Sequence, residues 1–180
     1  MEKKMYTATI VSCETGNQYE VIRQVLEAFE FRVIHEVIGR PTDFIQFLSG
    51  ERYLSSDFLI FSFHGVDGKF CMPELGEDVY YDNEPRGNFG AEEISEYCQL
   101  KAPFIINLGC GLGNEKLAAS FLSNACETYI GPNDYIDWTS SGFFAIRFFY
   151  ELYQNKRSKK EAFEVARGTD SETMLYEWFE

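Results

Sequence analysis

The sequence has few histidines and few basic residues, and both shortages restrict its chemistry. Only His35 and His64 occur in 180 residues, so any histidine-dependent reaction must use one of them. Lysine and arginine number 16 against 29 acidic residues, which gives a formal net charge of −13. Nucleic acids and anionic membranes are bound through basic patches, so we expect neither as a partner. A chain this acidic attracts basic peptides or proteins instead.

The cysteines show no pairing pattern. Their number is odd, and they form no CxxC pair and no Cys/His spacing typical of a metal site. We therefore expect neither a disulfide framework nor a metal or other cofactor, and a reducing compartment such as the cytoplasm fits best. The five are Cys13, Cys71, Cys98, Cys110 and Cys126.

Long apolar runs are also missing, and no stretch is long enough to cross a bilayer. The charges of Met1–Lys4 resemble the start of a signal peptide, but the apolar run that follows is short and contains Thr7 and Thr9. We expect a strand there. With 45% apolar residues and no repeat or linker, the chain suits a single domain over residues 1–180.

Strand-like and helix-like segments alternate along the chain. The alternation predicts a three-layer α/β fold with a mostly parallel sheet. The expected strands are 6–13, 31–39, 58–63, 104–108 and 127–131. The third and fourth of these are almost entirely apolar, as central strands covered on both faces are.

Helices are expected between and after these strands. The first has Val21, Ile22, Val25, Leu26 and Phe29 on one face. Further helices are expected at 41–48, at 91–100, directly after Cys110, at 140–153 and, from a capping box at Ser158–Glu161, through Arg167.

Two stretches are less regular. The glycine- and proline-containing stretch 65–90 predicts hairpins outside the main sheet, with strand-like pieces at 69–72 and 79–81. Residues 169–180 give no clear pattern.

Reactive side chains follow the two most apolar strands. His64-Gly65 ends one and Cys110-Gly111 ends the other. Ligands of open α/β sheets lie beyond the carboxyl ends of the strands, and neighbouring strands are about 5 Å apart. An imidazole and a thiol at that separation are the minimum for nucleophilic acyl transfer. His35 lies inside an expected strand and has no comparable placement.

Each residue of this pair suits a role. His64 can exchange protons near neutral pH. A helix directly after Cys110 would favour its thiolate through the helix dipole. The amides of Gly65 and Cys110 could stabilise a developing oxyanion.

These segments resemble the caspase-like clan of cysteine peptidases, and most of all its bacterial CHAT-type members. The resemblance covers roughly Tyr6–Arg167 and implies a six-stranded, mainly parallel sheet. It also implies Cys110 as nucleophile, His64 as general acid and base, and Gly65 in the oxyanion hole. We expect no fused partner domain of the kind common in CHAT proteins, and the Cys110 motif is richer in glycine than is usual in that family. The matching segments are 58–65, 104–113, 117–122, 129–131, Asp137, 148–150, Ser158, Glu161-Ala162 and Ala166.

In that clan the primary specificity pocket is built partly from the end of strand one and the loop after strand five. Glu14, Asp134 and Asp137 occupy these places, which implies binding of arginine or lysine in a peptide substrate. The alternative is that Glu14 is a solvated turn residue and Asp137 a helix N-cap.

Two other functions fit parts of the sequence. The glycine-rich segment 108–113 resembles the nucleoside-binding loop of S-adenosylmethionine-dependent methyltransferases. That loop lies early in its fold, however, and leaves His64-Gly65 unexplained. The second alternative is a catalytically silent caspase-like module that binds a partner protein, with the apolar helix 140–153 as a candidate surface.

Overall fold

The computed structural model describes residues 5–123 and 126–180. A six-stranded sheet with the order β2-β1-β3-β6-β7-β8 forms its centre. Five strands are parallel, and β8 runs antiparallel beside β7 at one edge. The strands are β1 (Thr7–Ser12), β2 (Arg32–Val37), β3 (Phe58–Ser62), β6 (Phe104–Asn107), β7 (Thr128–Pro132) and β8 (Tyr176–Phe179).

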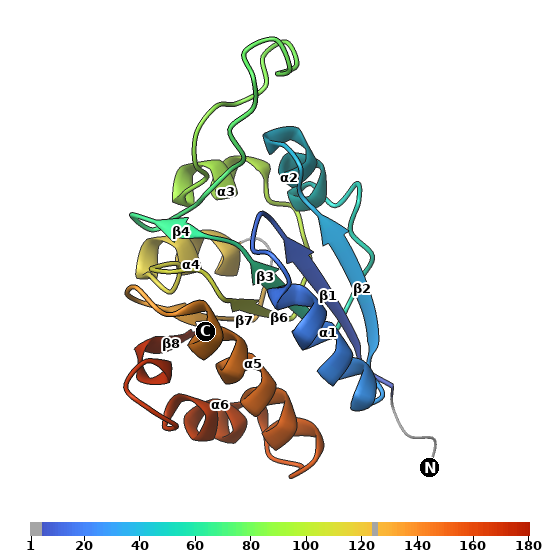
Figure 1. Ribbon diagram of the computed structural model, residues 1–180, viewed down its shortest axis with the longest axis vertical. Coiled ribbons are helices and arrows are strands. Elements are labelled where there is room, and N and C mark those ends of the chain that lie inside the picture. Colours follow the sequence, from blue (N-terminus) through green and yellow to red (C-terminus); the bar gives the residue numbers. More distant parts are fainter. Residues whose placement is uncertain (1–4, 124–125) are drawn as a thin grey trace.

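Helices cover both faces of the sheet and complete the expected three-layer α/β fold (Figure 1). One face carries α1 (Gln18–Ala28), α5 (Trp138–Tyr153) and α6 (Lys159–Arg167). The other carries α2 (Pro41–Leu48), α3 (Ala91–Tyr97) and α4 (Glu115–Leu122). The expected capping box is present, because Ser158 and Glu161 bond reciprocally at the start of α6.

The two central strands divide the core by alternation. Leu59 and Phe61 of β3 pack toward α2 and α4, whereas Phe58 and Ile60 pack toward α1 and α5. All five residues of β3 are buried. Side chains of successive strand residues point to opposite faces, so a strand covered on both sides is almost entirely apolar. The polar exception in β3 is Ser62, whose hydroxyl donates a hydrogen bond to Gln18.

The chain's last residues, whose sequence shows no clear pattern, complete the sheet. Residues 169–180 form a 3₁₀ turn, η1 (Thr173–Leu175), and then β8, which supplies the sixth strand. Tyr176 of β8 is fully buried and stacks on Phe144 of α5, with ring centroids 3.5 Å apart. This strand depends on its contacts with β7 and α5 more than on a local pattern.

Two predictions about local structure were wrong. Val21 is 45% exposed, because the buried face of α1 runs through Gln18, Ile22 and Leu26. The stretch 65–90 contains one short hairpin, β4 (Gly65–Val66) with β5 (Lys69–Phe70), and residues 79–81 form no strand.

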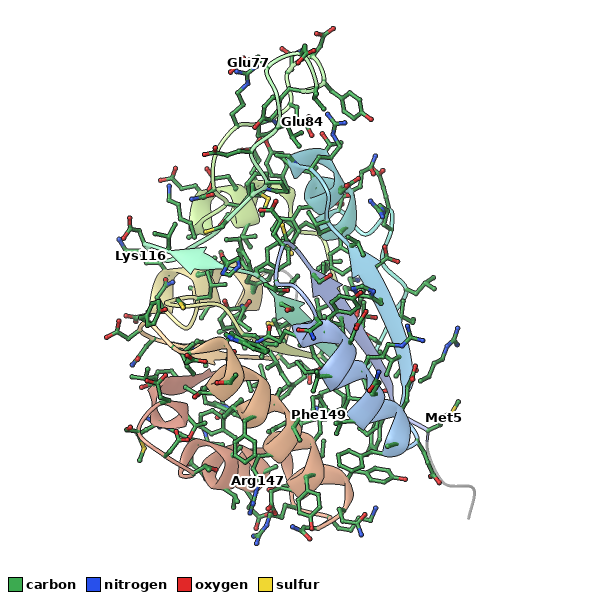
Figure 2. The ribbon with its side chains drawn as sticks, viewed as in Figure 1. Met5, Glu77, Glu84, Lys116, Arg147 and Phe149 are labelled. Carbon is green, nitrogen blue, oxygen red and sulfur yellow. The ribbon has the colours of Figure 1, made fainter. Side chains whose placement is uncertain are left out.

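Residues 73–88 form a loop that projects from the rest of the molecule (Figures 1 and 2). Its buried Glu84 accepts hydrogen bonds from Arg40 Nε (3.0 Å) and Nη2 (2.6 Å) and from the Thr42 amide (2.9 Å). The Arg40 guanidinium also lies 3.4 Å from the centre of the Tyr81 ring. These contacts, rather than strand pairing, fix the course of residues 79–84.

Helices capable of crossing a membrane are not found in the described part of the chain.

Candidate active site

Strand register brings the loops of His64 and Cys110 together. Phe61 of β3 is paired with Asn107 of β6, and the Leu108 amide donates to the Phe61 carbonyl over 3.0 Å. His64 is the third residue after Phe61, and Cys110 is the third residue after Asn107. The two residues line one pocket of about 410 Å³, which we call the narrow pocket.

A tight turn presents Cys110. The Leu112 amide donates to the Gly109 carbonyl over 3.3 Å, and Gly111, the third residue, has φ +66°. That conformation is the one for which the third position of a type II turn favours glycine. We call residues 109–112 the nucleophile turn, after the role that the sequence predicts for Cys110.

The nucleophile turn is fastened to the loop that follows β7. The Gly111 amide donates to the Asp134 carbonyl (3.0 Å), and the Cys110 Sγ lies 3.3 Å from the carbonyl oxygen of Ile136. The Ile136 amide also points at this sulfur, at 3.5 Å. Ile136 therefore holds the thiol inside the narrow pocket.

The expected helix does not follow Cys110 directly. Helix α4 begins at Glu115, and residues 111–114 separate it from the cysteine. Asn114 is the N-cap: its Oδ1 accepts the Leu117 amide, and its Nδ2 donates to the Gly111 carbonyl, both over 3.0 Å. The helix therefore supports the nucleophile turn through Asn114 rather than by beginning at the thiol.

Gly65 lies against the nucleophile turn. A β-carbon added there would collide with the carbonyl of Cys110. The Cys110 amide has no hydrogen-bond acceptor within the described residues. This amide is thus free to donate to a ligand, as an oxyanion hole requires.

The narrow pocket is acidic and aromatic at its rim. Among the described residues that line it are Glu14 and Asp137, and none of them is a lysine or arginine. Tyr135 and Trp138, 78% and 56% exposed, also line it. Because lysine and arginine bind to carboxylates and to aromatic faces, this lining suits a cationic side chain.

The two carboxylates of the narrow pocket are placed differently. Asp137 is the N-cap of α5: its Oδ1 accepts hydrogen bonds from the Thr139 hydroxyl (2.6 Å) and amide (2.9 Å). These bonds lower the pKa of the Asp137 carboxyl. Glu14 is exposed in a turn with φ +53° and makes no ion pair within residues 5–123 and 126–180. Its carboxylate is therefore free to meet a ligand.

Gln18 forms the inner wall of the narrow pocket. Its Oε1 accepts from Ser62 (2.7 Å), and its Nε2 donates to the Trp138 carbonyl (2.8 Å) and to Ser141 (3.0 Å). These bonds join β3, α1 and α5, so Gln18 shapes the pocket. Sequence reasoning missed this residue, although its position four residues before the buried Ile22 marks it as inward-facing.

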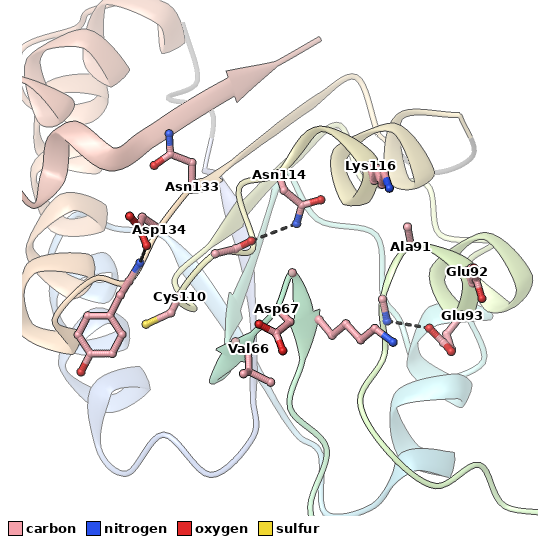
Figure 3. A pocket seen from close by; sticks show the side chains of 16 residues that line it. Val66, Asp67, Ala91, Glu92, Glu93, Cys110, Asn114, Lys116, Asn133 and Asp134 are labelled. Atoms are coloured by element: carbon pink, nitrogen blue, oxygen red, sulfur yellow. Dashed lines mark hydrogen bonds between the residues drawn. The ribbon is translucent and has the colours of Figure 1, made fainter.

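A second and larger pocket, which we call the wide cleft, opens on the other side of Cys110. It has a volume of about 680 Å³ and lies between the β4–β5 hairpin and the first residues of α3 and α4. Figure 3 shows Cys110 at one side and Glu92 and Glu93 at the opposite side. Cys110 and Tyr135 line both pockets. Asp134 lines only the wide cleft, whereas Glu14 and Asp137 line the narrow pocket.

The other four cysteines are poor nucleophiles. Burial raises the pKa of Cys13 and Cys126 to about 12 and that of Cys98 to about 11. Burial also raises the pKa of Cys71, whose amide donates to the His64 carbonyl over 3.0 Å. The reactive thiolate form is therefore disfavoured at all four.

The described residues contain no cluster of three or more His, Cys, Asp or Glu side chains that could hold a metal ion.

Comparison with known proteins identifies the fold but no family. No protein-family model and no curated protein matches the sequence. Solved structures do match. One match is a chain of the Saccharomyces cerevisiae separase–securin complex, with TM-score 0.59 and 12% sequence identity. The match covers 99% of the present chain and 12% of the chain in that complex.

Two proteinases are similar to a comparable degree. The Arg-specific cysteine proteinase gingipain R matches with TM-score 0.59 and 14% identity, over 94% of this chain and 44% of the proteinase. A secreted C11 cysteine protease from Bacteroides thetaiotaomicron matches with TM-score 0.51 and 10% identity, over 88% of this chain and 56% of the protease. The chain spans about half of these proteinases or less and has their caspase-like α/β fold.

Proposed function

We propose that this protein is a cysteine endopeptidase in which Cys110 is the nucleophile and His64 the general acid and base. The observation that carries the proposal is that both residues line the narrow pocket from the loops that follow two neighbouring strands. The fold is also that of an Arg-specific cysteine proteinase. No comparison supports a CHAT family assignment, so that part of the resemblance stays a prediction.

The reaction needs only groups of this chain and water. His64 takes the Cys110 thiol proton, and the thiolate attacks the carbonyl carbon of the scissile bond. The amides of Cys110 and Gly65 donate to the resulting oxyanion. His64 then gives its proton to the leaving amine as the C–N bond breaks. Water, deprotonated by His64, hydrolyses the thioester and restores the thiol.

The two pockets suggest how a peptide lies. Cys110 borders both the narrow pocket and the wide cleft. With the scissile bond at the Cys110 sulfur, the substrate residues before and after that bond would therefore lie in different pockets. We assign the narrow pocket to the side chain that precedes the scissile bond. Glu14 and Asp137 favour lysine or arginine there, with Trp138 offering an aromatic face.

Fluorogenic peptides and a cysteine-directed probe test the proposal. Peptides carrying Arg or Lys before the scissile bond should be cleaved, while otherwise identical peptides carrying Asp should not. Cys110→Ala and His64→Ala should abolish turnover, whereas Cys126→Ala should retain it. Glu14→Gln combined with Asp137→Asn should lower kcat/KM for the Arg peptide about tenfold, because each lost charge weakens a charge-assisted contact.

Two results would contradict parts of the proposal. If only the peptides carrying Asp before the scissile bond are cleaved, the proposed preference for Arg or Lys is wrong, but the proposal that the protein is a peptidase is kept. If Cys110 neither reacts with the probe nor supports cleavage of any peptide, the protein is not a peptidase, and a catalytically silent interaction module becomes the better description.

A further inference from the structure

A buried tyrosine lies behind the nucleophile turn. Tyr129 on β7 is fully buried, and its hydroxyl donates a 2.7 Å hydrogen bond to the carbonyl of Leu112, the last residue of the turn. The same hydroxyl accepts a short hydrogen bond from Asn107 Nδ2 on β6. Because Asn107 occupies the acceptor side of the hydroxyl, the tyrosine proton is directed to Leu112.

This contact differs from the others that hold the turn. The hydrogen bond between Gly111 and Asp134 joins two backbone segments on the pocket side. The Asn114 side chain also bonds to the turn, and it is half-buried. Tyr129 bonds from the interior, where Leu112 is also fully buried. Burial raises the Tyr129 pKa well above its ordinary value, which keeps the hydroxyl protonated. A buried carbonyl that loses its donor destabilises the segment that carries it.

The geometry points to Tyr129 as a positioning residue for the reaction: its bond to Leu112 fixes the nucleophile turn and thereby the placement of Cys110 relative to His64. This inference rests on the proposed function. Tyr129 lines neither the narrow pocket nor the wide cleft, so it acts on Cys110 through the turn and does not touch substrate.

Tyr129→Phe tests the inference, since it removes the hydroxyl and little else. In peptide cleavage we expect kcat to fall at least tenfold with KM within about twofold, because placement of the nucleophile changes while the pockets remain. Asn107→Ala should reduce kcat less, since the Tyr129–Leu112 bond survives in that variant.

A second readout does not depend on peptide turnover. The rate of Cys110 alkylation by iodoacetamide is followed as a function of pH, peptide by peptide, with mass spectrometry. In Tyr129→Phe this pH profile should change, because the placement of Cys110 relative to His64 changes.

Tyr53→Phe is the matched control. The Tyr53 hydroxyl bonds to Ser56 Oγ (3.0 Å) just before β3, at the end of the strand opposite His64. It should lower stability without changing kcat or the alkylation profile. If Tyr129→Phe behaves like Tyr53→Phe in both readouts, Tyr129 is only structural and the inference is wrong. Absence of peptide cleavage by the wild type would instead reject the proposed function, and the alkylation profile would still decide the role of Tyr129.

Discussion

Gly65 and Cys110 are packed so closely that a side chain on the glycine would occupy the position of the Cys110 carbonyl. The collision is with backbone, which cannot rotate away as a flexible side chain could. The loops after β3 and β6 therefore approach each other only because residue 65 is glycine.

We expect Gly65→Ala to lower kcat/KM for a cleaved peptide by about 100-fold or more. The methyl group would push the two loops apart, and a misplacement near 1 Å costs about that factor. Gly39→Ala is the control, because a β-carbon there would meet its nearest neighbour, Asp43 Oδ2, at an ordinary 3.5 Å. Wild-type activity in Gly65→Ala would show that the loops can separate without consequence.

Replacing Gln18 should damage the narrow pocket. Gln18→Leu keeps the approximate volume but leaves Ser141 Oγ and the Trp138 carbonyl without their amide donor. We expect the free energy of unfolding to fall by about 2 kcal/mol. A rise in KM should dominate the kinetic change, because the proposed function places the substrate side chain against Trp138.

Urea denaturation and steady-state kinetics measure both effects. Gln24→Leu provides the comparison, since Gln24 is exposed on the same helix. If Gln18→Leu lowers kcat and leaves KM unchanged, the wall does not contact substrate and the assignment of the narrow pocket is wrong.

Acid should release the projecting loop 73–88. The Arg40 guanidinium, with the amides of Thr42 and Tyr81, lowers the pKa of the Glu84 carboxyl well below its ordinary value. The ionised Glu84 therefore stabilises the folded loop fully above the ordinary glutamate pKa of about 4.3. This stabilisation is lost as the pH falls from that value toward the lower pKa that Glu84 has in the folded protein. Amide hydrogen exchange in residues 76–86 should accelerate over that acid range.

Glu84→Gln should lower Tm at pH 7 by about 5 °C and weaken the acid dependence, because Arg40 loses a buried partner. Glu77→Gln is the matched variant on the same loop: its ion pair with Arg86 is exposed, and a change of about 1 °C or less is expected. Equal effects of the two substitutions would mean that burial of Glu84 adds nothing.

Much of the fold follows from local patterns in the sequence. The strands 58–63 and 104–108 were predicted because a continuous apolar run is typical of a buried parallel strand. His64 and Cys110 were predicted to share a cleft because each follows such a strand directly, and both line the narrow pocket. Their catalytic roles stay predictions.

The rest depends on contacts distant in the sequence. Strand β8 is four residues long, too short for a reliable alternation, and forms where β7 and α5 provide partners. The Tyr129–Leu112 bond spans 17 residues and the Gln18–Ser141 bond 123, and neither leaves a local signature. The strand expected at 79–81 failed because Arg40, forty residues upstream, provides other partners for that loop.

The walls of the narrow pocket come from loops that follow four different strands, β1, β3, β6 and β7. A slip of one residue between β3 and β6 would turn every side chain beyond it to the opposite face of the sheet and separate imidazole from thiol. The narrow pocket is therefore complete only once these four strands have paired in register.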